Sequence, residues 1–147
     1  MIAKFRAELV ALETYFSKLE TQQLTINQCE ITYINHIPRD DGLSPSMWIR
    51  LLNVADGNQQ DDFSLTVRNV IRDADGKPLG RLIVEAKCAV TKDNKQVIQL
   101  NLTIRGAPQG TRIENAIEFL CSGRDRIVTK FAEITTDIAH QKWERIQ

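Results

Sequence analysis

One short stretch of the chain gathers side chains that could carry out acid–base or metal chemistry. It contains an amide, an imidazole, a guanidinium and two carboxylates, at Asn35, His36, Arg39, Asp40 and Asp41. An imidazole beside paired carboxylates can bind a metal ion or act as a general acid and base. The simpler interpretation is a strand that ends at Pro38 and continues into a solvated loop. We favour the simpler interpretation and keep this stretch as an alternative site.

Other catalytic patterns are weak. No serine lies in a nucleophile-elbow sequence, and the stretch from Gly106 to Gly110 lacks the spacing of a phosphate-binding loop. The three cysteines are an odd number without CxxC spacing, which indicates neither a disulfide framework nor a zinc site. An enzyme is therefore disfavoured, and we expect no metal and no cofactor.

Composition suits one globular domain over residues 1–147. The chain is 42% hydrophobic and 26% charged, which allows a sizeable core. Nineteen basic and nineteen acidic side chains cancel, so no long-range field favours nucleic acid or an anionic membrane. No segment reaches the run of about 18 apolar residues that spans a membrane, and the N-terminus is too charged for a signal peptide. A cytoplasmic location is the expectation.

Hydrophobic spacing predicts helices at both ends of the chain. The C-terminal helix is predicted from Arg112 to about Ile138, with an interruption near Thr135. Its apolar stripe comprises Ile113, Ile117, Leu120, Ile127, Phe131, Ile134 and Ile138. The N-terminal stripe comprises Ile2, Phe5, Leu9, Leu12, Phe16 and Leu19. This first helix is expected to pack beside the last one.

Four segments between these helices alternate apolar and polar residues as half-buried strands do. They are residues 29–37, 63–71, 82–90 and 98–104. A short helix is predicted after Ser44-Pro45, and turns are predicted around Gly76 and Asn94. The fold class is therefore α+β: a two-layer sandwich of order α-β-α-β-β-β-α, with a four-stranded antiparallel sheet packed on the N- and C-terminal helices.

One face of this sheet would remain outside the core. Its expected contact residues are Arg68, Arg72, Ile83, Lys87, Asn101, Thr103 and Arg105. Nucleic acid is disfavoured because this face has no aromatic side chain on which bases could stack. We expect it to bind a second copy of the chain or another protein, against the alternative of an ordinary solvated sheet.

Small-molecule binding is the alternative function. A sheet that curves around the last helix, as in helix-grip folds, can enclose an apolar pocket. The lining would come from Cys88, Leu100, Leu102, Phe119, Ile127 and Phe131. A filled core is the commoner result for such residues.

Two stretches resemble a sporadically distributed bacterial protein family of unknown function. One is the strand motif YIN followed by a basic and an apolar residue, here Tyr33 to Ile37. The other is a C-terminal helix with the pattern FL, I, F and IT, here Phe119, Leu120, Ile127, Phe131, Ile134 and Thr135, followed by Trp143. Typical members are longer at the N-terminus, which implies a short member or a C-terminal domain. The sporadic distribution suggests a bacterial defence or toxin–antitoxin-like system. Together, these observations predict a non-catalytic, oligomeric protein-interaction module.

Overall fold

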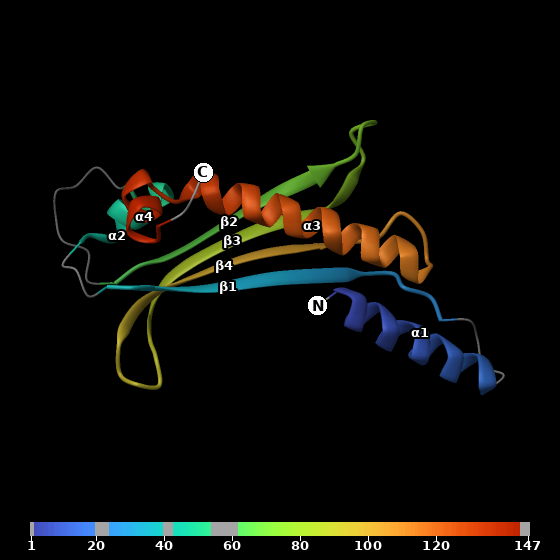
Figure 1. The fold of residues 1–147 in the computed structure, drawn as a ribbon. Helices are drawn as coiled ribbons and strands as arrows, with labels where there is room; N and C mark the ends of the chain where they lie inside the picture. Colours follow the sequence, from blue (N-terminus) through green and yellow to red (C-terminus); the bar gives the residue numbers. More distant parts are fainter. Residues whose placement is uncertain (1, 20–23, 40–42, 54–61, 145–147) are drawn as a thin grey trace.

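The computed structural model describes residues 2–19, 24–39, 43–53 and 62–144. Its helices and strands follow the predicted order (Figure 1). They are α1 (Ile2–Lys18), β1 (Cys29–Pro38), α2 (Pro45–Trp48), the 3₁₀ turn η1 (Arg50–Leu52), β2 (Ser64–Arg72), β3 (Pro78–Val90), β4 (Gln96–Gly106), α3 (Ile113–Ile134) and α4 (Asp137–Lys142).

Within these described residues, the four strands form one antiparallel sheet in the order β1-β4-β3-β2. The first strand therefore lies beside the last, and β1 and β2 are the edges of the sheet. Gly76 and Asn94 adopt the positive φ angles of 80° and 60° that the two hairpin turns require. The α+β fold with an open four-stranded sheet and helices at both ends is confirmed.

The core lies between the sheet and α3. Leu100, Leu102 and Ile127 are completely buried, and Val84 and Ile104 are almost so. The residues of β4 on this inner face are those that sequence alternation placed inward. Burial of each such side chain contributes about 1.5–3 kcal/mol to folding, so this layer supplies much of the driving force.

Helix α3 packs on the inner face of the sheet, where its contacts are mainly with the edge strand β1 and its neighbour β4. Gly123 explains the close approach on this side. A Cβ atom at Gly123 would lie 3.0 Å from Cγ2 of Ile31 and 3.5 Å from Cγ2 of Ile104. A larger residue would therefore force the helix away from these two strands.

The helical region breaks at Thr135, where an interruption was predicted. The Thr135 hydroxyl donates to the carbonyl of Phe131 (2.7 Å), and the Thr136 hydroxyl accepts from the backbone N–H of Ala139 (3.2 Å) at the start of α4. The Arg50 side chain donates to the carbonyl of Thr135 (3.0 Å) and to Asp137 (2.8 Å). These bonds hold α2 and η1 against the junction between α3 and α4.

Helix α1 occupies a different environment. It contacts the start of α3, where Arg6 lies 3.6 Å from Glu114, and Figure 1 shows it to one side of the sheet. Packing beside the last helix was expected. However, none of its 17 residues is buried, although all of them lie within the described part of the chain.

Candidate functional site

The outer face of the sheet, opposite α3, carries the residues predicted as a contact surface. Cross-strand register places Arg68, Ile83 and Thr103 in one row across β2, β3 and β4. Neighbouring rows contain Asn101 opposite Glu85, Lys87 opposite Gln99, and Arg105 opposite Arg81. Six of the seven predicted residues are thus brought together.

Arg72 lies apart from these six. It is the last residue of β2, and its guanidinium donates to the carbonyl of Gly76 (2.8 Å) in the turn that follows. The turn after β2 therefore explains the position of its side chain.

Side chains on the outer face are already linked to one another. The hydroxyls of Thr32 and Thr103 form a hydrogen bond of 2.8 Å, the Gln99 amide donates to Asn101 (3.2 Å), and Arg105 pairs with Glu30. A polar hollow of about 210 Å³ lies on this face. Its lining includes Ser64, Thr66, Glu85, Lys87, Gln99 and Asn101. Thr103 is itself buried, so these polar groups are held in place by bonds within the sheet.

Large apolar side chains interrupt this polar surface at Ile34, Val70 and the half-buried Ile83. Ile34 is 62% exposed and Val70 is 50% exposed. The outward positions of the four strands, which all lie in the described part of the chain, include His36 but no Phe, Tyr or Trp.

The alternative site around His36 does not converge in the residues that the structure describes. Asn35 and His36 are successive strand residues and point to opposite faces of the sheet. The Asn35 amide donates to the carbonyl of Leu100 (3.2 Å), and Arg39 lies 3.3 Å from the sulfur of Cys88. Asp40 and Asp41 lie outside the described residues. No group of three metal-binding side chains occurs in the described ranges.

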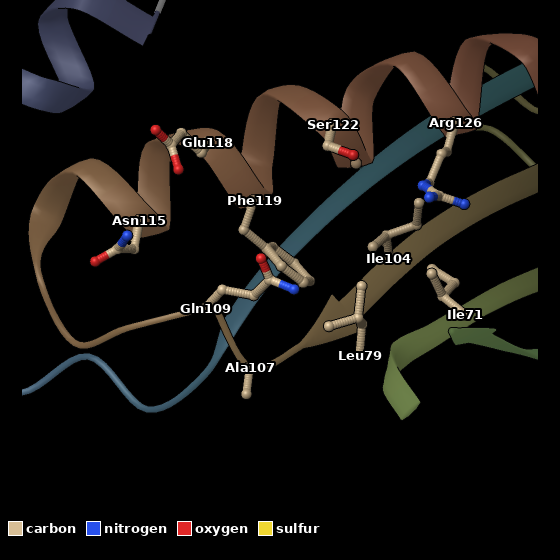
Figure 2. A pocket seen from close by; sticks show the side chains of 11 residues that line it. Ile71, Leu79, Ile104, Ala107, Gln109, Asn115, Glu118, Phe119, Ser122 and Arg126 are labelled. Carbon is tan, nitrogen blue, oxygen red and sulfur yellow. The ribbon is translucent and has the colours of Figure 1, made fainter. Parts of the chain in front are cut away.

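A groove runs between α3 and the β2 side of the sheet. Two adjoining hollows, of about 200 and 720 Å³, share Ile71, Ile104, Ser122 and Arg126. Figure 2 shows Phe119 pointing from α3 into the smaller hollow, above Leu79. The groove exists because α3 is drawn toward β1 and β4, which leaves the inner face of β2 partly uncovered.

Two paired glycines directly follow and precede Leu79 and Ala107, which line the smaller hollow. Gly80 and Gly106 face each other across β3 and β4, next to Ile71 on β2. A Cβ atom on Gly80 would lie 2.5 Å from the carbonyl oxygen of Arg105, so no side chain fits there. The inner face consequently lacks two side chains below the start of α3.

The predicted pocket lining was largely wrong for this groove. Phe119 is the only one of the six predicted residues that lines either hollow. Leu100, Leu102 and Ile127 are 0% exposed and belong to the filled core, and Cys88 and Phe131 are half-buried elsewhere. Apolar residues at inward positions pack together first, and the open space remains where the helix is absent.

Arg126 stands in the middle of the groove. Figure 2 shows its side chain extending from α3 toward Ile104 and Ile71. It forms no hydrogen bond or ion pair with the residues that the structure describes. A guanidinium above an apolar floor can hold the carboxylate of a small amphipathic molecule.

The apolar stripe of α1 was not predicted as a site. Leu12, Phe5 and Leu19 on this stripe are 42%, 44% and 49% exposed. The stripe residues alternate at steps of three and four, from Ile2 to Leu19, without exception. This strict spacing is typical of a coiled-coil seam, whereas a helix that covers a sheet usually has a wider apolar face. That narrow spacing could have identified the stripe as a contact surface.

The three cysteines show no reactive arrangement. Cys29, Cys88 and Cys121 form no disulfide with one another or with any other residue that the structure describes, and Cys29 is buried. Burial raises the pKa of the Cys29 thiol, because the surrounding apolar atoms disfavour the thiolate. Its thiol is therefore protonated and unreactive at neutral pH.

Comparison with known proteins adds no relative: no family model, curated protein or solved structure matches this chain. The resemblance to a bacterial family therefore stays a prediction. Within the described ranges, no helix combines the length and hydrophobicity needed to cross a membrane.

Proposed function

We propose that this chain is a non-catalytic protein-interaction module that associates through the apolar stripe of α1 and the outer face of the sheet. The observation that carries the proposal is that α1, a helix of 17 residues, buries none of them. It forms a regular helix in which four residues of the apolar stripe stay exposed (Ile2, Phe5, Leu12 and Leu19), whereas Leu9 and Phe16 are half-buried. An uncovered stripe of this kind is a contact surface for another chain.

The energetics of helix formation support this proposal. An isolated helix of about 12–15 residues is marginal in water, and most helices in proteins are stabilised by packing of their apolar face. Here the contact with α3 includes one exposed ion pair, of Arg6 with Glu114, which contributes about 0–1 kcal/mol. Burying Leu12 alone against a partner would contribute about 1.5–3 kcal/mol.

The outer face of the sheet supplies a second, more polar surface. Lys87, Arg68 and Arg105 lie among hydroxyl and amide groups, with Ile34 and Val70 as isolated apolar contacts. This mixture resembles the polar rim of an interface rather than its centre. We therefore assign the main contribution to α1 and a supporting role to the sheet.

Light scattering of the purified chain, followed by mass spectrometry of proteins retained from native lysate, tests the proposal. Leu12→Glu should abolish association, because it places a charge on the apolar stripe. Val10→Glu is the matched control: Val10 is 45% exposed on the same helix but lies off the stripe. Equal association of both variants and the wild type would refute the role of α1.

The double variant Arg68→Glu/Asn101→Glu tests the outer face separately. It should weaken the same association while leaving the fold intact by circular dichroism. If oligomeric state and every retained protein are unchanged, the outer face has no part in binding.

A second candidate function, small-molecule binding, is favoured by the groove of Figure 2. Its apolar floor and its central Arg126 suit a ligand with an apolar body and a carboxylate. Native mass spectrometry should then show an adduct that is lost on denaturation and in Arg126→Leu. Arg124→Leu is the control, because Arg124 pairs with Asp125 on the exposed side of α3. An adduct retained in Arg126→Leu would exclude this site.

We also propose a cytoplasmic location. The support is chemical: three cysteines that form no disulfide within the described part of the chain are typical of proteins in a reducing compartment.

A further inference from the structure

We infer that the occupant of the α1 stripe is α1 of a second copy of this chain, in antiparallel orientation. This inference rests on the proposed function and names its partner. The stripe has the coiled-coil pattern, with Ile2, Leu9 and Phe16 at one core position and Phe5, Leu12 and Leu19 at the other. The helix spans about 25 Å, so it presents both rows along its whole length.

Antiparallel pairing gives six core layers, of which the outermost two use Leu19, the first residue after α1. With the twofold axis between Val10 and Ala11, Ile2 meets Leu19 of the second copy, Phe5 meets Phe16, and Leu9 meets Leu12. Twofold symmetry repeats each of these layers. Every layer joins two large apolar side chains, and no polar residue enters the core of the pair. A symmetric contact of this kind closes on itself and forms a dimer rather than a filament.

Charges beside the seam select the antiparallel orientation. Arg6 and Glu13 lie on one side of the apolar stripe, and Glu8 lies on the other side. In an antiparallel pair, residues on the same side of the stripe meet, so Arg6 of each chain lies next to Glu13 of the other. In a parallel pair, residues on opposite flanks meet, and Glu8 would lie next to Glu13 on both sides. The sequence therefore offers two attractive pairs in one orientation and two repulsive pairs in the other.

The structure leaves these charged groups available. Glu8 and Glu13 form no ion pair with the residues that the structure describes. Arg6 has a side chain that is 55% exposed, and its single contact with Glu114 is 3.6 Å long. A guanidinium has five N–H donors, so Arg6 can bind Glu114 and Glu13 of the second copy together.

Charge reversal, measured by sedimentation equilibrium of the full chain, tests the inference. The wild type should dimerise, and Glu13→Arg should weaken the dimer about tenfold because it turns both attractive pairs into repulsive ones. The double variant Arg6→Glu/Glu13→Arg should restore the wild-type dissociation constant. Glu8→Arg, which faces Tyr15 in the antiparallel pair, should leave it unchanged.

Three results would overturn the inference. A wild-type chain that stays monomeric at about 100 μM has no second copy as its partner. If Glu8→Arg or Glu13→Arg strengthens the dimer, the two helices are parallel, because either variant would turn the repulsive Glu8–Glu13 pairs of that orientation into attractive ones. A double variant as weak as Glu13→Arg excludes contact between these two residues. A monomeric chain that still binds another protein, and loses it in Leu12→Glu, would overturn this inference while supporting the proposed function.

Discussion

The first and last long helices have similar apolar stripes but different surroundings. α3 buries Ile113, Ala116, Gly123, Ile127 and Ile134 against the sheet, whereas α1 buries no residue. The difference does not come from hydrophobicity, because the α1 stripe contains two phenylalanines, three leucines and an isoleucine. It comes from position: α3 packs on the sheet with a glycine where it meets β1, whereas α1 contacts the start of α3. An apolar stripe in the sequence therefore predicts that a helix face makes contacts, but it does not predict whether the sheet of the same chain or another surface makes them.

The largest expected effect is on the covered helix. Ile127→Ala should lower the free energy of unfolding by about 2–5 kcal/mol, because Ile127 is 0% exposed and its removal leaves a cavity. Leu12→Ala in α1 is the comparison and should cost much less in the monomer. Urea denaturation, at a protein concentration too low for self-association, measures the free energy of unfolding of both variants. Equal losses would mean that α1 belongs to the same core.

Overpacking at the closest point should also destabilise the fold. Gly123→Leu places a large side chain where even a Cβ atom would lie 3.0 Å from Ile31, and it should cost about 1–3 kcal/mol. The control is Arg124→Leu, whose side chain points to solvent on the same helix. Thermal unfolding of the two variants gives the difference. A neutral Gly123→Leu would show that α3 can move away from β1 without loss.

Local stability should differ between the two helices. In a monomeric sample, backbone amides of α1 should exchange with solvent faster than those of α3, because α1 can unfold without exposing the core. Hydrogen exchange measured by mass spectrometry resolves the two segments. Raising the protein concentration should slow exchange in α1 alone if it pairs with a second copy. Equal protection of both helices at low concentration would contradict the comparison.

The smallest effect concerns the direct contact between the helices. Arg6→Ala and Glu114→Ala should each change the free energy of unfolding by about 0–1 kcal/mol, because the pair is exposed and 3.6 Å long. A double-mutant cycle isolates the coupling between these two side chains. A coupling well above this range would show that the ion pair fixes α1 against α3.

Most of the fold follows from local patterns. The alternation in the strands, the turns at Gly76 and Asn94, and the interruption at Thr135 were all readable because each depends on neighbouring residues. The candidate contact residues on the sheet were placed on one face for the same reason, since strand alternation has a period of two. Arg72 departs from the group because a turn, not the strand, holds its side chain.

The position of the groove could not be read in this way. Its lining combines α3, both ends of the β2–β3 hairpin and the segment after β4, at Phe119, Ile71, Leu79 and Ala107. The open space depends on how far α3 is shifted toward β1, and that shift depends on a contact between Gly123 and a strand some ninety residues earlier. A fit between residues so far apart in the sequence leaves no periodic pattern from which it could be predicted.

The amino-acid sequence by itself determined which segments are helices and strands, which strand residues face inward, and the strict seam of α1. These properties depend on backbone preference and hydrophobic spacing within one segment. Only the tertiary structure decided that α3 covers the sheet, that α1 stays uncovered, and that Arg126 stands over an apolar floor. Those outcomes depend on the volumes of side chains that meet from distant parts of the chain, because a close-packed core accepts only the helix that fits it.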